Sequence, residues 1–299
     1  MADDGRMDSA TEAFLVHRNL LFTVAYEMLG SATDAEDVLQ ETWLRWMKID
    51  LAQVHDRRAY LVRIATRRSL DRLRTMKRRK ELYVGPWLPE PLLTAPDVAE
   101  DVELAESVSM ALMLVLETLS PTERAVFVLR EVFDVGYDEI AAAVGKTPAT
   151  VRQIAHRARR HVDARRPREA VSPSQSRAVL ASFQRAVETR DLQGLLDVLA
   201  PEVVLISDGG GVKQAAPQPI IGAGKVARMI VSGLGKAQVA LTGELTVVNG
   251  NPALLLCVDG EIDGVIATRV EDTRITGLYY VRNPHKLTRI GPETPLTLK

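Results

Sequence analysis

The chain has 299 residues, 46% of them hydrophobic and 26% charged, with a mean hydropathy of -0.02 and a formal net charge of -1. That composition excludes an intrinsically disordered chain, and the length allows two or three packed domains. A single cysteine, Cys257, excludes an internal disulfide framework.

The N-terminus and the apolar runs bear on localisation. The acidic start MADDGRMDSA lacks the basic and apolar regions of a signal peptide. The longest apolar runs, such as MALMLVL (110–116), are too short to span a bilayer. We therefore expect a cytoplasmic protein that makes no membrane contact.

Charge is distributed in blocks along the chain. Residues 1–56 contain 4 Lys/Arg and 11 Asp/Glu, whereas residues 57–80 contain 11 basic side chains and only Asp71 as an acid. A second basic block, residues 145–168, carries 8 Lys/Arg against Asp163 alone. A single run of this kind is usually a solvated helix face, but two runs on separate helices favour two nucleic-acid contacts.

Residues 10–80 have a helical pattern throughout. In GSATDAEDVLQETWLRWM, Thr33 and Glu36 form a capping-box signature at the start of a helix. Its predicted buried face comprises Ala35, Val38, Leu39, Thr42 and Trp46, which leaves Asp34, Asp37 and Glu41 pointing outward. The next helix carries an apolar stripe inside the first basic block, made of Leu61, Ile64, Ala65, Leu73 and Met76. That helix is predicted to have one core face and one arginine face.

Residues 81–104 are predicted to be a linker, because four prolines interrupt any helix there. Its motif GPWLPEP places Trp87 between prolines, in a segment with no helical or strand period. A tryptophan buries ~150–250 Å², worth roughly 4–6 kcal/mol as an upper bound. From these residues alone, local packing of Trp87 on the helical regions is the expectation; the alternative is that another domain of the chain covers it.

The stretch from residue 120 to 162 predicts a helix-turn-helix. Ser120, Pro121 and Glu123 indicate a capped helix start, and a short helix from about Tyr137 ends at Gly145. Thr147 and Pro148 begin a third helix, with Val151, Ala155 and Ala158 as its buried stripe. The second helix of such a motif lies in the major groove of DNA. Its exposed positions are Thr150, Arg152, Gln153, His156, Arg157 and Arg160, while Arg159, Arg165 and Arg166 suit phosphate contacts.

After a second linker at 164–175 the pattern changes to α+β. Two helices at about 175–189 and 191–199 precede an apolar strand at 203–207 and a short helix near 222–234. Four further strands are predicted at 238–248, 253–258, 262–270 and 274–282. Helices followed by a bent antiparallel sheet predict an α+β cone.

Three segments together resemble regions two and four of the extracytoplasmic-function class of bacterial sigma factors. They are DAEDVLQETWLRW, AYLVRIATRRSLDRLR and LSPTERAVFVLREVFDVGYDEIAAAVGKTPATVRQIAHRARR, and the resemblance covers roughly residues 10–165. It implies a subunit that directs RNA polymerase core to promoter DNA. The implied organisation is region two at 8–80, the linker at 81–104, region four at 105–167 and a regulatory domain at 175–290.

The resemblance also implies roles for particular residues. The acidic helix would dock on the polymerase through Asp34, Asp37, Glu41 and Trp43. The promoter -10 element would contact Arg57, Arg58, Tyr60, Arg63, Arg67, Arg68 and Arg72, and the helix-turn-helix would read the -35 element. A cationic groove with an aromatic pocket suits unpaired bases, although the spacing of Tyr60 with Leu61 and Ile64 fits a core residue equally well.

The C-terminal pattern resembles SnoaL-like members of the NTF2-like fold, which a subgroup of these sigma factors carries. The motifs WLPEP, DGGG followed by Lys213, and NPHKL (283–287) support that subgroup. The expected regulatory contact comprises Trp87, Leu88, Pro89, Glu90 and Pro91 in the linker, with Asp208, Gly209, Gly210, Gly211, Lys213, Asn283, Pro284, Lys286 and Leu287 in the domain. Either Lys213 or Lys286 is expected to meet Glu90.

Other chemistry has less support in the sequence. DGGG lacks the GK[ST] and helix of a phosphate-binding loop, and His156 and His161 diverge on their helix, so we expect no cofactor and no metal site. Asp208, Tyr279 and Tyr280 are acid/base candidates by type alone, and an unknown small ligand in the cone is conceivable. The alternatives to a sigma factor are a helix-turn-helix regulator with a ligand-binding domain and an NTF2-like enzyme fused to a DNA-binding module.

Overall fold

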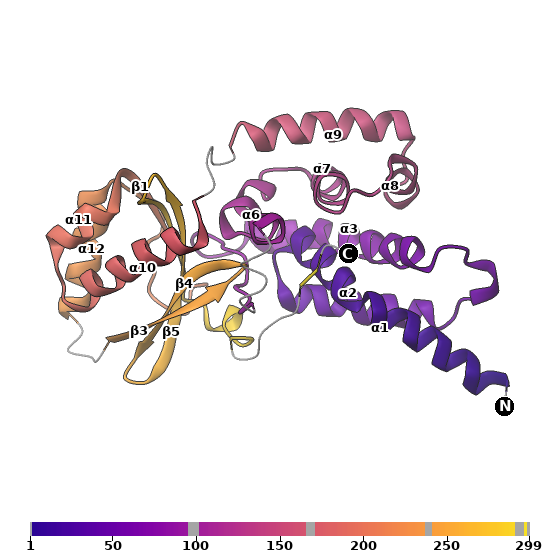
Figure 1. Ribbon diagram of the computed structural model, residues 1–299, viewed down its shortest axis with the longest axis horizontal. Helices are drawn as coiled ribbons and strands as arrows, with labels where there is room; N and C mark the ends of the chain where they lie inside the picture. The colour runs from indigo at the N-terminus through magenta and orange to yellow at the C-terminus, as the bar shows by residue number, and fades with distance from the viewer. Residues whose placement is uncertain (1, 95–101, 166–170, 237–240, 291–295, 298–299) are drawn as a thin grey trace. The chain divides into compact units, whose positions relative to one another are not determined.

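The structure is a computed structural model that describes residues 2–94, 102–165, 171–236, 241–290 and 296–297 (Figure 1). The chain divides into two compact units. The first comprises Met1–Glu81, Val115–Arg166 and Pro295–Lys299, and the second comprises Leu82–Leu114 and Pro167–Thr294. Arg166 and residues 167–170, at the junction, lie outside the described residues.

Helices α1 (Ala2–Leu29), α2 (Ala32–Trp46) and α3 (Arg57–Glu81) pack together in the first unit, with the 3-10 turn η1 (Leu51–Gln53) between the last two. The predicted apolar stripes of α2 and α3 are buried, which confirms both helices. The predicted cap of α2 is wrong. Ser31 is the N-cap, and its hydroxyl accepts a hydrogen bond from the Asp34 N–H at 3.1 Å. The helix begins before Thr33, so Thr33 lies inside it.

The helix-turn-helix prediction is confirmed in the same unit. Helix α7 (Pro121–Phe127) starts with a capping box between Ser120 and Glu123, and the π-turn η2 (Val128–Val132) follows it. Helix α8 (Tyr137–Val144) ends at Gly145, whose φ of 69° suits a residue without a side chain. The Thr147 hydroxyl then caps α9 (Pro148–Asp163), whose stripe Val151, Ala155 and Ala158 is buried.

Several polar contacts join these two groups of helices within the first unit. The Arg124 side chain is 2% exposed and donates to the Glu27 carbonyl through Nε at 3.0 Å and Nη2 at 2.8 Å. Arg124 and Lys80 also pair with Glu117. Arg67 of α3 donates to the Ala142 carbonyl at 2.6 Å, at the C-terminal end of α8. Leu296 is also buried, and the neighbouring Thr297 N–H donates to the Thr23 hydroxyl at 3.2 Å in this unit.

The second unit is built on a six-stranded sheet with the order β2-β1-β6-β5-β4-β3. Its strands are β1 (Leu199–Asp208), β2 (Ile220–Ile221), β3 (Leu241–Val248), β4 (Asn251–Val258), β5 (Glu261–Glu271) and β6 (Arg274–Val281). The α+β class is confirmed, but the expectation of a purely antiparallel sheet is wrong, because β1 and β6 pair in parallel. A long connection through four strands and a helix separates β1 from β6, so no hairpin constrains their direction.

The two faces of this sheet are covered by different parts of the chain. Helices α10 (Pro173–Glu188), α11 (Leu192–Val198) and α12 (Ala223–Lys236) cover one face (Figure 1). Apolar side chains such as Leu180, Phe183 and Leu195 pack there against the sheet. The other face carries Ala267, Tyr279 and Val281. It packs against Leu88 of the linker and Met110 of α6, as a separate cluster.

The linker therefore belongs to the same compact unit as the C-terminal sheet. Residues 82–94 run along it and are followed by α5 (Val102–Ser107) and α6 (Met110–Leu116), while residues 95–101 lie outside the described residues. Leu93 forms an isolated antiparallel bridge with Val248 of the edge strand β3. Closer to the start of the linker, a turn of 3-10 helix, η3 (Pro284–Lys286), contacts Leu88 through Lys286.

Candidate functional site

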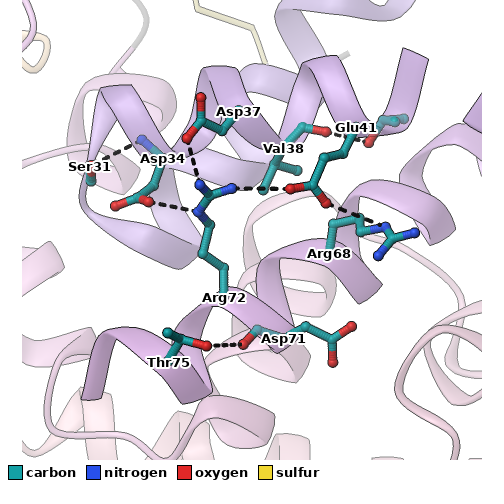
Figure 2. A network of polar contacts seen from close by, with 10 residues as sticks. Ser31, Asp34, Asp37, Val38, Glu41, Arg68, Asp71, Arg72 and Thr75 are labelled. Carbon is teal, nitrogen blue, oxygen red and sulfur yellow. Dashed lines mark hydrogen bonds and ion pairs between the residues drawn. The ribbon is translucent and has the colours of Figure 1, made fainter. Parts of the chain in front are cut away.

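One arginine joins two groups of residues that the sequence assigned to separate partners. Arg72 of α3 donates through Nε to Asp34 at 2.7 Å, through Nη2 to Asp37 at 2.5 Å and through Nη1 to Glu41 at 3.3 Å (Figure 2). Arg68, one turn away, lies 3.6 Å from Glu41. The expected polymerase-binding acids and two expected DNA-binding arginines are therefore a single ion-pair network.

The three acids differ in exposure, and the expectation that all point outward is wrong for Asp34. The Asp34 side chain is 11% exposed, whereas those of Asp37 and Glu41 are 45% and 46% exposed. Asp34 follows the Ser31 cap by three residues, so the helix start turns it toward α3. Asp37 and Glu41 are thus the acids that a partner can reach. Trp43 of the same helix is half-buried, with its ring 5.1 Å from that of Phe14.

The other expected -10 residues occupy α3 and vary in accessibility. Arg57 and Arg67 are exposed, while Arg58 and Arg63 are half-buried. The Arg63 guanidinium lies 4.5 Å from the centre of the Tyr60 ring, which itself lies 6.0 Å from the Trp46 ring. Half-buried Tyr60 therefore packs against Trp46 and also lies under Arg63, and its role at the -10 element stays a prediction.

Helix α9 presents the expected -35 residues on one solvent-facing side. Arg152, Gln153, His156, Arg157 and Arg160 are exposed, and Thr150 is half-buried. Two arginines of this helix are paired with acids of neighbouring elements. Arg157 donates to Glu123 at 2.7 Å, and Arg159 donates to Glu131 through two hydrogen bonds of 2.7 Å. Both pairs are exposed on the arginine side, so a phosphate can displace the acid at small cost.

The most buried polar site of the second unit is Asp208, at the end of β1. Its side chain is fully buried and accepts four hydrogen bonds. Two come from the linker, namely the Tyr83 hydroxyl at 2.6 Å and the Leu88 N–H at 2.8 Å. The others come from the Lys286 ammonium at 2.7 Å and the Gly210 N–H at 3.1 Å. The carboxylate is therefore the point at which the linker is attached to the sheet.

Lys286 completes this attachment and covers Trp87. Its ammonium donates to the Leu88 carbonyl at 2.5 Å and lies 4.2 Å from the centre of the Trp87 ring and 4.8 Å from that of Tyr83. A desolvated cation over an aromatic ring contributes up to about 2 kcal/mol. Trp87 is half-buried within the second unit, while the adjacent Leu88, Pro89 and Pro91 are buried and Glu90 is half-buried. The residues of WLPEP, DGGG and NPHKL thus meet in one site.

The glycines after Asp208 have a steric reason. A Cβ on Gly209 would lie 2.0 Å from the Lys213 carbonyl oxygen, and one on Gly210 would lie 2.2 Å from Asn283 Nδ2. Gly210 and Gly211 also have φ values of 60° and 74°. The loop therefore folds closely enough for buried Asn283 to donate to the Tyr83 hydroxyl at 2.7 Å. Pro284 and Leu287, both half-buried, flank Lys286 in the same turn.

The sequence predicted that Lys213 or Lys286 meets Glu90, and that contact stays a prediction. Lys286 pairs with Asp208, and Lys213 pairs with Asp263 at 2.9 Å. Both aspartates belong to strands of the C-terminal sheet. Burial raises the pKa of Tyr83, and its hydrogen bond to Asp208 raises it further, so this phenol stays a neutral donor.

A second polar cluster surrounds Asp263 of β5. It accepts hydrogen bonds from Lys213, from Arg282 through two nitrogens and from the Tyr280 hydroxyl at 2.5 Å. Burial alone would raise the pKa of Asp263, but the hydrogen bonds from Arg282, Tyr280 and Lys213 outweigh it and hold the pKa at about 2. Burial raises the pKa of Tyr280, which stays protonated. Asp263 therefore stays ionised and Tyr280 stays protonated near pH 7, so neither group is suited to proton transfer at that pH.

The acid/base candidates of the sequence do not form a dyad. The Asp208 carboxylate accepts hydrogen bonds from the linker, and the Tyr280 hydroxyl donates to Asp263. Tyr279 lies in the apolar cluster on the face of the sheet opposite to Tyr280. Tyr83 and Arg124 are polar residues of these contacts that sequence reasoning missed. Tyr83 follows the basic helix by two residues, and no local pattern distinguishes it from a solvated linker residue.

The second unit also contains a cavity. This cavity, of about 360 Å³, lies on the linker-covered face, against Met110, Ser172 and Arg269. Apolar side chains from α10, α11 and α12 occupy the other face, so the expected small ligand of the cone stays a prediction. Among the described residues no group of three or more His, Cys, Asp or Glu is placed to hold a metal, and none of their helices has the length and apolarity to cross a membrane.

Comparison with known families assigns the two helical segments. Sigma-70 region 2 matches residues 14–79, and Sigma-70 region 4 matches residues 109–162. These segments contain the acidic helix, the arginine helix and the helix-turn-helix described above. They define the class of protein as a sigma factor of the sigma-70 type.

Relatives along nearly the full chain narrow the class. The ECF RNA polymerase sigma factor SigJ of Mycobacterium tuberculosis is 34% identical over 284 residues, which is 91% of each chain. Its crystal structure covers 96% of this chain and 100% of its own, with a TM-score of 0.73. The probable ECF sigma factor SigI of the same species is 32% identical over 96% of this chain and 97% of its own. The chain therefore belongs to the ECF RNA polymerase sigma factors.

An NTF2-like protein of known structure from Burkholderia xenovorans covers 40% of this chain and 98% of its own, at 18% identity and a TM-score of 0.30. The predicted fold class of two all-α sigma domains followed by an α+β domain is confirmed by the family matches, the full-length match and the sheet itself.

Proposed function

We propose that this sigma factor, which directs transcription initiation, is controlled in cis by its C-terminal domain through the linker that joins regions two and four. The observation that carries the proposal is the attachment of Leu88 and Tyr83 to buried Asp208. The linker connects the helices expected to contact the -10 and -35 elements. A domain that fixes the linker therefore also restricts the separation of the two DNA-binding regions.

The strength of the attachment supports control in cis. Because the linker and the sheet share one chain, the effective concentration is on the order of 1 mM, and an intrinsic Kd of ~10 μM leaves about 99% of the linker bound. The prolines of GPWLPEP hold the segment extended, so less conformational entropy is lost when it binds. A modest change in the site is therefore enough to change the bound population.

The contacts with polymerase and DNA follow from exposure and charge. Asp37, Glu41 and Trp43 are proposed to face the polymerase core, with Asp34 supporting them from inside the network. Arg57, Arg58, Arg63, Arg67, Arg68 and Arg72 around Tyr60 are proposed for the -10 element. Thr150, Arg152, Gln153, His156, Arg157 and Arg160 are proposed for the -35 element. Because Arg72 and Arg68 contact the acids, the residues proposed to bind polymerase and those proposed to bind the -10 element belong to one ion-pair network.

Two readings compete with this function. A free-standing regulator needs neither the acidic helix nor the arginine helix, yet both are formed and packed against each other. An enzyme needs an acid/base pair open to substrate, whereas Asp208 and Asp263 are each occupied by several donors. The geometry favours a regulatory domain over both.

The test is transcription in vitro with purified polymerase core. The full chain should direct initiation from its own promoter, and Asp208→Asn should change the yield at least five-fold because it weakens the hold on the linker. Asp259→Asn, in an exposed turn of the same domain, is the matched control. No initiation from any promoter upstream of the gene or its neighbours would contradict the sigma function. Equal yields from Asp208→Asn and the control would contradict control in cis.

A further inference from the structure

The turn between β3 and β4 is buried although its sequence is typical of an exposed hairpin. Asn249 and Gly250 have φ values of 53° and 69°, the left-handed pair of a two-residue turn. The Asn249 residue is only 1% exposed. A buried amide is costly unless its donor and acceptor are both satisfied. Its partners therefore indicate what the turn binds.

The first partner is the linker beyond the Trp87 site. The Asn249 Oδ1 accepts from the Leu92 N–H at 3.0 Å, and the Asn249 N–H donates to the Leu92 carbonyl at 2.9 Å. Next to it, the Thr94 N–H donates to the Val247 carbonyl at 3.0 Å, and the Gly250 N–H donates to the Thr94 hydroxyl at 3.0 Å. The linker thus extends the edge of β3, with Leu92 buried.

The second partner is the segment that leads into region four. The Asn249 Nδ2 donates to the Val108 carbonyl at 2.9 Å and lies 3.8 Å from the sulfur of Met113. Asn251 of the same turn donates to the Ala105 carbonyl at 3.0 Å. The region four match begins at residue 109, one residue after Val108. A single side chain therefore holds two chain segments, at Leu92 and at Val108, against the C-terminal sheet.

We propose that the β3–β4 turn is a second receptor for two segments of this chain, residues 92–94 and 105–108, and that Asn249 is the residue that positions the start of region four. The inference rests on the proposed control in cis and deepens it. Asp208 fixes where the linker begins, and Asn249 fixes where region four leaves the C-terminal domain. The amide is required because Leu92 offers an N–H and Val108 offers a carbonyl. A carboxylate in this position would face the Val108 oxygen with no donor.

The chain contains a matched control turn. Asp259 and Gly260, between β4 and β5, have φ values of 52° and 83°, and the Asp259 residue is exposed. Glycine adopts this backbone without strain, so Asn249→Gly and Asp259→Gly alter the two turns alike. Of the two, Asn249→Gly alone removes the contacts to Leu92 and Val108.

Hydrogen exchange of the full-length protein tests the proposal. In Asn249→Gly, exchange of the Leu92 and Thr94 amides should accelerate at least ten-fold, while the Leu88 amide, bonded to Asp208, stays protected. Asp259→Gly should leave all three amides as in the wild type. Asn249→Asp keeps an acceptor for the Leu92 N–H and loses the donor to the Val108 carbonyl, so it should leave Leu92 protected and accelerate exchange in residues 105–108. Wild-type protection at Leu92 in Asn249→Gly, or wild-type exchange at 105–108 in Asn249→Asp, would overturn the proposal.

The outcome is separable from that of the proposed function. The positioning role also requires that Asn249→Gly alter the preferred spacing between promoter -10 and -35 elements in transcription with polymerase core, and an unchanged spacing preference would overturn it. Control in cis is tested independently by Asp208→Asn, whose site retains its contacts when Asn249 is changed. If Asp208→Asn leaves the transcription yield unchanged while Asn249→Gly alters the spacing preference, the regulatory contact lies at the β3–β4 turn and not at the Trp87 site.

Discussion

Lys286 donates to the buried carboxylate of Asp208 at 2.7 Å, and the Lys286 side chain is only 8% exposed. The pair also holds the linker, because both residues bond the backbone of Leu88. Asp208 accepts from the Leu88 N–H, and Lys286 donates to the Leu88 carbonyl. A buried pair of this kind is costly to break from one side, since the remaining charge is left without a counter-ion.

The pair should therefore behave cooperatively when it is mutated. We expect Lys286→Met or Asp208→Asn to lower the free energy of unfolding of the C-terminal unit by about 3–5 kcal/mol, and the double variant to lose less than the sum. Exchange of the Leu88 amide should accelerate in both single variants. The control Lys225→Met, at an exposed lysine, should cost within about 0.5 kcal/mol. Additive losses in the double variant would show that the two residues act independently.

Reversal of the exposed acids should weaken polymerase binding. Asp37→Lys and Glu41→Lys are each expected to weaken binding to the core at least ten-fold, while exposed substitutions change stability by about 0.5 kcal/mol. The measurement is a titration of labelled polymerase core with each variant. Core binding by Asp37→Lys equal to wild type would remove this face from the interface.

Substitutions in α9 should separate base reading from phosphate binding. Gln153→Ala and Arg157→Ala are expected to reduce discrimination at particular -35 base pairs by about 1–3 kcal/mol. Arg165→Ala should weaken binding to all sequences and lower the dependence of affinity on salt. Affinities for a set of single-base promoter variants at two salt concentrations measure both effects. Uniform losses at all three positions would reduce α9 to a phosphate-binding helix.

The contact between the two helical groups depends on Arg124. Its guanidinium is 2% exposed and bonds the Glu27 carbonyl and Glu117, so Arg124→Ala leaves both acceptors buried without it. We expect a loss of about 3–5 kcal/mol in the unfolding of the first unit. Arg130→Ala, at a half-buried arginine of η2, should cost far less. Urea unfolding of the two variants makes the comparison, and similar losses would contradict a special role for Arg124.

Acid should weaken the C-terminal unit through Asp263. Its pKa is about 2 in the folded chain against an ordinary value of 3.8, so its stabilising contribution is complete above about pH 4 and is lost as the pH falls through about 2. The loss is on the order of 1–2 kcal/mol after allowance for partial exposure. Asp263→Asn should lower stability at pH 6 and flatten the slope between pH 4 and 2. An unchanged slope would assign the acid sensitivity to other carboxylates.

Features fixed by neighbouring residues were predictable from the sequence. Ser120 with Glu123, Thr147 with Pro148, and Gly145 each specify a helix end through contacts within four residues, and all three agree with the structure. The meeting of Trp87 with the DGGG and NPHKL segments was also expected, but its chemistry was not. The sequence shows that Lys286 is near the site without showing that its partner is Asp208, 78 residues away.

Features that depend on tertiary pairing were missed for a physical reason. Asp34 has the same helical periodicity as an exposed acid, and only the approach of Arg72, 38 residues away, buries it. The burial of Asn249 is similar. The pair Asn249–Gly250 is a strong hairpin signal, yet nothing local indicates that the linker covers the turn. The parallel pairing of β1 with β6 likewise depends on the topology of the whole domain.

Control in cis is tested most directly by Trp87→Ala in two backgrounds, the full chain and a chain that ends at Arg168. Transcription from the same promoter with polymerase core is measured for all four proteins. The substitution should change the yield at least five-fold in the full chain, where Trp87 lies under Lys286, and by less than two-fold in the shortened chain. Equal effects in both backgrounds would contradict control by the C-terminal domain.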